Sequence, residues 1–298
     1  MYKLVHSILY LISLLPFPVL YAISDFMCLF VSQFYRKKLV YDNLKSSFPE
    51  KSEEEILQIR KKFYHQVCDK FVEDIKMLSI SKEEMMKRIT FGGLEGCKKR
   101  HDAGQNFHFL YLSHFGNWEW ISSINYYTQP WCTSAQIYHK ISSKITNELF
   151  LELRGQFGGV NIEMKESLRK ILAMRKEKKN YIIGFISDQQ PKWNSIHHFV
   201  PFLNHDTAVF TGTEQIARKI DAFVGYGRMS RPKRGYYHLE IIPLEDHPAT
   251  CSENELTNKY FELLEADIKE HPEMWLWTHK RWSRTKEEWE RRQQEGIK

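Results

Sequence analysis

The chain has few of the residues that mark disordered, disulfide-linked or metal-stabilised proteins. Its 298 residues include only 14 glycines, 10 prolines and 5 cysteines, and no two cysteines form a CxxC pair. So little glycine and proline argues against a collagen-like or disordered chain, and scattered cysteines argue against a disulfide framework or a thiolate zinc site. We therefore expect a packed globular protein in a reducing compartment, long enough for one large domain or two small ones.

A strong charge of one sign is also missing. The 43 Lys and Arg residues exceed the 37 Asp and Glu residues by six, which gives a net charge of +6. This excess suits an anionic partner without identifying it, because nucleic acid, a membrane surface, a phosphorylated substrate and an acidic carrier protein all fit. Since the basic residues are interspersed with acidic ones outside short clusters, we do not expect a nucleic-acid-binding stripe.

Long uncharged stretches are missing except at the N-terminus. Residues 4–24 contain no Asp, Glu, Lys or Arg, and a helix of about 21 residues rises roughly 30 Å, the thickness of the hydrocarbon layer. Pro16 and Pro18 would kink this helix, so an interfacial or re-entrant hairpin competes with a spanning helix, a signal peptide and a core helix. We rank a membrane anchor at 1–38 first, and the basic residues 36–38 place the following domain on the cytoplasmic side.

Short apolar runs alternate with helical patterns in the rest of the chain. Capping boxes at Ser52/Glu55 and Ser252/Glu255 each precede an amphipathic helix, and the first helix extends to about Leu78. This alternation predicts α/β layers. The predicted strands are 107–112, 132–138, 181–187, 222–226 and 236–242, and the predicted helices between them are 117 onward, 143–157, 165–179 and 212–220.

No internal repeat, low-complexity block or linker divides residues 80–282. We therefore expect a single domain at 39–282. The last residues, 283–298, are rich in charge and are expected to form an exposed tail.

The segment FHFLYLSHFGNWEW, residues 107–120, carries the most informative polar residues. An apolar strand ends just before His114, a helix could begin at Asn117, and Glu119 follows the histidine by five residues. On one continuous helix the two side chains would be about 140° apart, but at a strand-to-helix junction Glu119 can fold back towards the imidazole. Such a pair lets the imidazole take a proton from a hydroxyl while the carboxylate fixes its tautomer.

The same junction would also offer a site for negative charge. Backbone amides at the start of the helix, from about Phe115 to Trp118, would stabilise a developing anion, and Gly116 would let a ligand approach the backbone closely. The alternative is structural: a histidine with its hydrogen bonds satisfied at a strand end, and a first-turn carboxylate favoured by the helix dipole. The HxxxxE spacing alone does not decide between the two.

The HFGNWE block resembles the HxxxxD/E signature of glycerolipid and lysophospholipid acyltransferases, and in particular the HxGNWE block of the bacterial lipid A biosynthesis (lauroyl/myristoyl) acyltransferases. Other segments resemble this family in the same order: Arg154 in ELRGQFGG, Asp188-Gln189 after a buried strand, residues 199–218, and PEMWLWTHKRW at 272–282. Several ordered motifs over nearly the whole chain are more specific than one. The chain departs from the family at PFLN, where PFFG is usual. This departure bears on the length of the acyl chain and the identity of the acceptor more than on the chemistry.

The resemblance implies a glycerolipid acyltransferase-like fold, with a mixed central sheet flanked by helices behind an N-terminal membrane-anchoring helix or hairpin. It also implies transfer of a fatty acyl chain from a thioester of acyl carrier protein or coenzyme A to a hydroxyl of a lipid A precursor or related glycolipid at the inner membrane, without a further cofactor. His114 would be the general base and Glu119 its partner. The residues that would bind substrate or stabilise charge are Arg154, Asp188, Gln189, Gly116 and Asn117.

Several of these residues also have structural interpretations. Arg154 could end a surface helix, and Asp188 could form a turn or hold Arg154 or the acceptor sugar. Trp277, Lys280 and Arg281 fit a belt at the lipid headgroups, or a C-terminal element packed by its tryptophans.

Two other functions stay open. One is acyl transfer to a lysophospholipid or aminolipid, although no FPEGT string that would bind glycerol phosphate occurs. The other is a non-catalytic lipid-binding protein of the same fold, against which the presence of both His114 and Glu119 argues. No metal is expected, because the spacing of the candidate ligands matches no known pattern. These candidates are His197, His198, His205 and Asp206.

Overall fold

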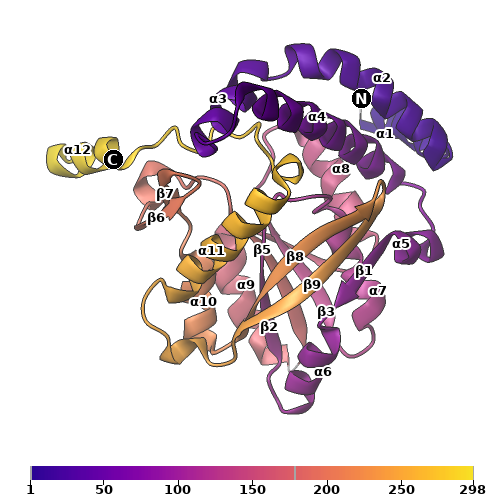
Figure 1. Cartoon of the computed structure of the whole chain (residues 1–298). Coiled ribbons are helices and arrows are strands. Elements are labelled where there is room, and N and C mark those ends of the chain that lie inside the picture. Colours follow the sequence, from indigo (N-terminus) through magenta and orange to yellow (C-terminus); the bar gives the residue numbers. More distant parts are fainter. Residues whose placement is uncertain (1, 178, 298) are drawn as a thin grey trace.

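A seven-stranded sheet with the strand order β1-β9-β8-β2-β5-β3-β4 forms the centre of the protein. The computed structural model describes residues 2–177 and 179–297 (Figure 1). β8 and β9 pair antiparallel and the other neighbouring strands pair parallel. The strands of this sheet are β1 (Ile89–Gly92), β2 (Phe107–Leu112), β3 (Thr133–Tyr138), β4 (Val160–Glu163), β5 (Tyr181–Ile186), β8 (Phe223–Lys233) and β9 (Tyr236–Glu245).

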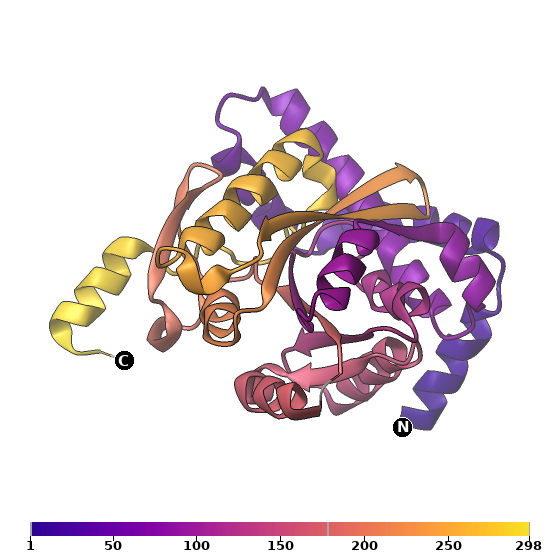
Figure 2. The ribbon, with the colours of Figure 1, turned by 90° about the horizontal axis from the view of Figure 1, so that it is seen from below.

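Helices lie on both faces of the sheet, so the predicted mixed α/β sheet flanked by helices is confirmed. α11 covers one face, and α8 and α9 cover the other (Figure 2). The helices are α1 (Tyr2–Ser13), α2 (Phe17–Phe34), α3 (Lys37–Ser47), α4 (Glu53–Lys76), α5 (Lys82–Arg88), α6 (Leu94–Asp102), α7 (Asn125–Thr128), α8 (Lys144–Gly155), α9 (Ser167–Met174), α10 (Gly212–Ile220), α11 (Glu255–Glu270) and α12 (Lys286–Glu295). Short 3-10 helices are η1 (Trp120–Ile124), η2 (Met164–Glu166), η3 (Arg175–Glu177), η4 (Trp193–Ser195), η5 (Pro248–Thr250) and η6 (Pro272–Met274).

The central strands β2 and β5 are apolar except for His108. They read FHFLYL and YIIGFI, and every residue except the last of β5 is buried. Parallel strands covered on both faces show such continuous apolar runs, which is why the sequence located them closely. β8 runs longer than predicted, because Gly235, with a φ of 73°, closes a tight turn from which both strands continue as a hairpin.

The predicted helix starts are confirmed in part. At α4 the capping box is complete: Glu55 N–H donates to Ser52 Oγ at 3.3 Å, and Ser52 N–H donates to Glu55 Oε2 at 2.8 Å. At α11 only the second half forms, from Ser252 N–H to Glu255 Oε2 at 3.0 Å. The predicted helix 165–179 is shorter, since η2 and η3 flank α9 and one residue of this range lies outside the described residues.

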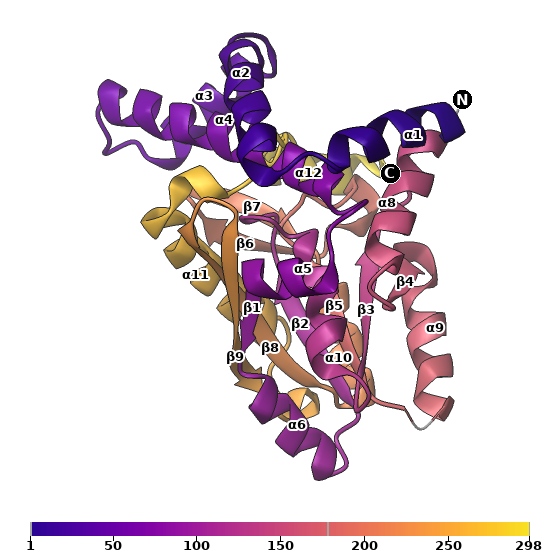
Figure 3. The same cartoon turned by 90° about the vertical axis from the view of Figure 1, so that its right-hand side faces the viewer.

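The apolar N-terminal segment forms two helices instead of one straight span. α1 ends at Ser13 and α2 begins at Phe17, since Pro16 lacks an N–H and breaks the helix between them (Figure 3). α2 is long and apolar enough to cross a membrane by length and composition, a test that core helices and signal sequences also pass. Residues 4–24 therefore do not form one continuous helix.

The C-terminal residues form more structure than a tail. Thr285 caps α12, and the ring of Trp289 on this helix packs on Phe199 with the ring centroids 5.5 Å apart. Phe199 belongs to a separate antiparallel hairpin of β6 (His198–Phe202) and β7 (His205–Val209). The predicted charged tail at 283–298 thus contains a helix, α12, which has no buried residue and extends away from the sheet (Figure 1).

Candidate active site

The pairing of two neighbouring strands brings His114 together with Asp188. β2 and β5 are parallel, and Leu112 lies opposite Ile186. Two residues beyond that pair, His114 Nδ1 lies 2.7 Å from Asp188 Oδ1, and the His114 backbone N–H donates to Asp188 Oδ2 at 3.0 Å. The chain runs from β2 to β3 on one side and returns through β5 to β8 on the other, so the strand order reverses between β2 and β5. The site forms at the carboxyl ends of these two parallel strands, a usual place for α/β active sites.

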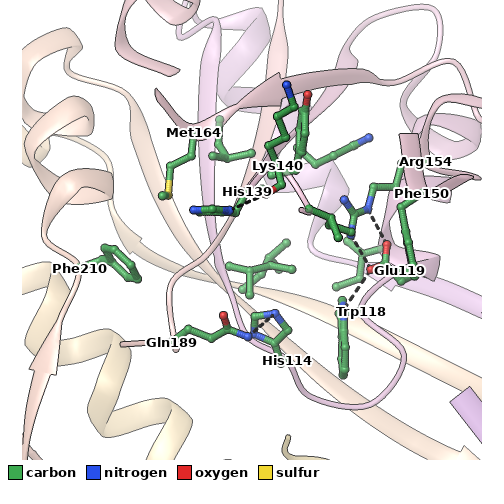
Figure 4. A pocket seen from close by; sticks show the side chains of 18 of the residues that line it. His114, Trp118, Glu119, His139, Lys140, Phe150, Arg154, Met164, Gln189 and Phe210 are labelled. Carbon is green, nitrogen blue, oxygen red and sulfur yellow. Dashed lines mark hydrogen bonds and ion pairs between the residues drawn. The ribbon is translucent and has the colours of Figure 1, made fainter. Parts of the chain in front are cut away.

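Asp188 is held as a carboxylate. It is only 2% exposed, and the indole Nε1 of Trp275 donates to its Oδ2 at 2.8 Å. Burial opposes ionisation, but the imidazole of His114 and these hydrogen bonds outweigh it and hold the pKa of Asp188 below its usual value. An ionised Asp188 accepts the Nδ1 proton of His114, which leaves Nε2 as an acceptor. Gln189 Nε2 lies 3.2 Å from His114 Nε2 and donates to it (Figure 4).

Glu119 forms no hydrogen bond or ion pair with His114 in the described structure, so the expected direct His–Glu pair is not present. Its carboxylate accepts from Arg154 Nε and NH2, each at 2.7 Å, and from Trp118 Nε1 at 3.2 Å (Figure 4). The helix expected from Asn117 begins later than predicted, since 113–119 form a loop and helical structure covers 120–128 as η1 and α7. The Glu119 carboxylate points towards α8 and forms a bidentate ion pair with Arg154, which lies in the last turn of that helix.

The Glu119–Arg154 pair lies in a buried set of charges. Burial opposes the ionisation of Glu119, but Arg154 and Lys70 outweigh it and lower its pKa. Lys70 Nζ lies 4.0 Å from the ring centroid of Trp118 and 2.6 Å from Asp74 Oδ2. Burial also opposes the charge of Arg154, but Glu119 and Asp74 raise its pKa, so the guanidinium stays charged.

Gly116 and Asn117 hold the loop and do not contact the large cavity described below. The Gly116 amide donates to Met274 O at 2.9 Å, so it is not a donor for an anion. Gly116 has a φ of 62°, and an added Cβ would lie 2.9 Å from Met229 Cγ, so the space beside it is filled by protein. Asn117 is fully buried and donates to Glu73 Oε2 at 2.8 Å. The structure therefore places neither residue in the lining of that cavity.

A cavity of about 1190 Å³ opens beside His114. Glu119, Arg154 and Gln189 line it together with His114 (Figure 4). Asp188 is buried and does not belong to this lining. The floor is apolar and is formed mainly by one face of β2 and β5. Its residues include Leu110, Leu112, Ile121, Ile124, Ala135, Ile182, Gly184 and Ile186. The cavity thus combines an apolar floor with a polar end at His114.

Basic residues from four separate segments surround this cavity. Glu119 is the one acidic residue in its described lining, and Arg154 neutralises it. These residues could not be recognised from the sequence, because each is an ordinary surface residue in its own segment and no motif links them. They are Lys140, Lys165, Lys192 and Arg284.

The C-terminal aromatic and basic cluster is mostly core. Trp277 is fully buried and donates to Pro272 O at 2.6 Å, and Arg281 is 1% exposed and donates to Ala208 O at 2.8 Å. Only Lys280 of the three candidate headgroup residues is exposed. The headgroup role is therefore wrong for Trp277 and Arg281, and the alternative of an element packed by its tryptophans holds.

Within residues 2–177 and 179–297, no three His, Cys, Asp or Glu side chains are grouped to hold a metal ion. In a comparison with known families, the family described as bacterial lipid A biosynthesis acyltransferase matches residues 1–284. No individual curated protein matches the chain.

Proposed function

The chain belongs to the bacterial lipid A biosynthesis acyltransferase family, as its ordered motifs predicted, and from this we propose that it moves a fatty acyl chain from an acyl thioester to a hydroxyl of a lipid A precursor or related glycolipid. The observation that carries the proposal is the His114–Asp188 pair at the polar end of an apolar cavity. The donor in this proposal is acyl carrier protein or coenzyme A, and no other cofactor takes part.

His114 acts as the general base in the proposed reaction. Its Nε2 takes the proton of the acceptor hydroxyl while the oxygen attacks the thioester carbonyl carbon. The tetrahedral intermediate then collapses, the carbon–sulfur bond breaks, and the proton passes from Nε2 to the leaving thiolate. The ester and a free thiol are the products, and no covalent acyl-enzyme is needed. Asp188 fixes the tautomer and stabilises the imidazolium that forms.

Arg154 is the cation proposed to stabilise the oxyanion, and Gln189 is a neutral donor beside it. Both line the cavity with His114. Glu119 holds the guanidinium of Arg154 through two hydrogen bonds, so its proposed task is to orient this cation and not the imidazole.

The apolar floor is proposed to take the acyl chain. Ile182, Gly184 and Ile186 point to the same side of β5, and residues 182–186 span about 13 Å at the rise of a parallel strand. The basic residues around the cavity favour a donor or acceptor that carries phosphate or carboxylate groups.

The N-terminal helices are proposed to hold the protein on the cytoplasmic face of the inner membrane. α1 and α2 expose apolar side chains, of which Phe26, Leu29 and Phe30 are 63%, 65% and 54% exposed. α2 is followed by Tyr35, which lines the cavity, and His6 on α1 lies 3.0 Å from Glu152 on α8. A lipid held at these helices would therefore be next to the cavity.

An acyl-transfer assay with the purified full-length protein tests the proposal. Radiolabelled acyl thioesters of acyl carrier protein and of coenzyme A are offered with a lipid A precursor in one arm and lysophospholipids or aminolipids in the other. We expect label in the glycolipid and a loss of about 10²- to 10⁴-fold in turnover for His114→Ala. His139→Ala is the matched control, because His139 lines the same cavity but, among the described residues, hydrogen-bonds a backbone carbonyl and no side chain.

Near-normal turnover of His114→Ala would refute the base assignment. Label that appears only in lysophospholipids or aminolipids would replace the acceptor, and an absence of label with every acceptor would favour a lipid-binding protein.

A further inference from the structure

Glu73 on α4 is a buried carboxylate that the proposed chemistry does not use. It is fully buried, and burial raises the pKa of its carboxyl group. The neighbouring carboxylates Asp69 and Asp74 pair with Arg234 and Lys70, whereas Glu73 forms no ion pair among the described residues. A carboxylate in this position needs hydrogen-bond donors to offset its desolvation.

The donors to Glu73 come from three separate parts of the chain. Tyr21 on α2 donates its hydroxyl to Oε1 at 2.9 Å. Asn117 in the loop 113–119 donates Nδ2 to Oε2 at 2.8 Å, and Tyr237 on β9 donates its hydroxyl to the same oxygen at 2.9 Å. Glu73 therefore joins the apolar N-terminal helix, the sheet and the loop between His114 and Glu119.

The contact with Asn117 fixes the middle of this loop. Asn117 Oδ1 also accepts the backbone N–H of Trp120 at 3.3 Å, and Trp120 Nε1 donates to the Glu73 carbonyl oxygen at 3.3 Å. The residues that carry the site lie at the two ends of the loop, three residues before and two residues after Asn117. A shift of Asn117 would therefore move the base and the partner of Arg154 together.

We infer that Glu73 is a positioning residue that couples α2 to the loop bearing His114 and Glu119. The inference rests on the proposed function for its kinetic effects, but not for its structural ones. A displacement of about 1 Å at reacting groups can lower turnover by roughly 10²-fold, so a loosened loop reduces kcat more than it changes KM.

Two hydroxyls on α2 provide a matched pair of variants. Tyr21 donates to Glu73, which holds the loop, whereas Ser24 donates to Asp69 Oδ1 at 2.7 Å, and Asp69 does not contact the loop. Tyr21→Phe and Ser24→Ala each remove one hydroxyl that α2 donates to a buried α4 carboxylate. Only the first should disturb the loop.

Substitution of Glu73 itself separates hydrogen bonding from charge. A glutamine can keep its oxygen towards Asn117 and Tyr237 and direct its NH2 to the Tyr21 hydroxyl, which can accept. A methionine of similar length can do neither. We expect Glu73→Gln to retain kcat within about threefold and Glu73→Met to lose about tenfold or more.

The experiment uses the full-length protein and two readouts. Steady-state kinetics should show an approximately tenfold lower kcat for Tyr21→Phe with KM within about twofold, and little change for Ser24→Ala. Hydrogen–deuterium exchange should show faster exchange of peptides covering 113–120 in Tyr21→Phe and Glu73→Met, but not in Ser24→Ala or Glu73→Gln.

Equal exchange of the loop in Tyr21→Phe and Ser24→Ala would overturn the inference, and so would a loss in Glu73→Gln as large as in Glu73→Met. If the loop exchanges faster as expected but the wild-type protein transfers no acyl group, the coupling stands and the proposed function fails.

Discussion

Two buried carboxylates lie close to the site, and their partners give them different tasks. Asp188 bonds the imidazole of His114, and Glu119 bonds the guanidinium of Arg154. Both carboxyl groups have pKa values below the usual ones in spite of burial, because each faces a cationic or protonated partner. At the residue scale, the base and the cation of the proposed reaction are therefore positioned by separate acids.

Asp188→Asn should prevent His114 from acting as a base while leaving its imidazole in place. Asp188 Oδ2 accepts two N–H donors, from the His114 backbone and Trp275, so the amide oxygen of Asn would take that place and its NH2 would face His114 Nδ1. That arrangement puts the imidazole proton on Nε2, where the base must be free. We expect kcat to fall by about 10²- to 10⁴-fold with KM nearly unchanged.

Glu119→Gln is the comparison, measured by the same steady-state kinetics. It removes the charged partner of Arg154 but leaves the tautomer of His114 alone, so it should reduce kcat less than Asp188→Asn does. The reverse order of the two losses would contradict this division of tasks.

Because His108 on β2 is buried, we expect the folded protein to lose stability at acidic pH. Both ring nitrogens are buried without a partner in the described structure, and burial lowers the pKa of His108 to about 4. Below about pH 6.5 the unfolded chain binds a proton that the folded His108 does not. Its contribution to stability is thus complete above about pH 6.5 and decreases as the pH falls towards 4, by at most about 1.4 kcal/mol per pH unit.

His108→Leu should remove this part of the pH dependence. Denaturant unfolding at pH 7.5 and 5.5 should show the wild type losing about 1.4 kcal/mol more stability than the variant between the two pH values. Parallel losses in both proteins would show that His108 is protonated in the folded state.

At the scale of elements, α2 has two faces with opposite chemistry. One face donates the hydroxyls of Tyr21 and Ser24 to carboxylates of α4. The other exposes Phe26, Leu29 and Phe30. A soluble helix rarely leaves large apolar side chains of this kind clustered in solvent, so this face suits a lipid surface.

Charges on the apolar face should release the protein from lipid. The double variant Leu29→Glu/Phe30→Glu should lose most binding to anionic phospholipid vesicles in flotation experiments, because buried carboxylates are costly in the acyl region. Leu57→Glu is the control, since Leu57 is 38% exposed but lies on α4. Equal vesicle binding by the double variant and the control would place the lipid-binding surface elsewhere.

The cavity belongs to the scale of the whole molecule. Its floor comes from β2, β3 and β5, Arg154 comes from α8, and Arg284 comes from the segment before α12. No single element contains it, and in the proposed function its depth along β5 sets the room for the acyl chain. Gly184 lies on this floor, and an added Cβ would lie 2.8 Å from Leu112 Cδ1, which is the movable end of a side chain.

Gly184→Val should therefore shorten the preferred acyl chain. We expect kcat/KM for long acyl donors to fall at least about tenfold relative to short ones, because each excluded methylene loses its burial. Competition between donors of different length measures this ratio directly. Gly212→Ala, at a position with nothing within 4 Å of an added Cβ, is the control and should leave the ratio unchanged. An unchanged ratio in Gly184→Val would exclude this floor as the acyl site.

The sequence by itself determined the local structure around the site. The apolar runs of β2 and β5 located both strand ends, so His114 and Asp188 were each recognised as residues that follow a buried strand. The capping box of Ser52 and Glu55 located the start of α4. These features depend on residues that are close together in the chain, so the sequence pattern predicts them directly.

Only the tertiary structure decided which residues meet. That β5 pairs with β2 in register puts Asp188 and not Glu119 on the imidazole. The bridge from Phe115 to Trp275 belongs to the loop 113–119, which delays the expected helix to Trp120. The basic surroundings of the cavity and the burial of Arg281 follow in the same way from distant segments. Strand order, register and packing arise from contacts between residues far apart in the chain, and the hydrophobic pattern of each segment is compatible with several such partners.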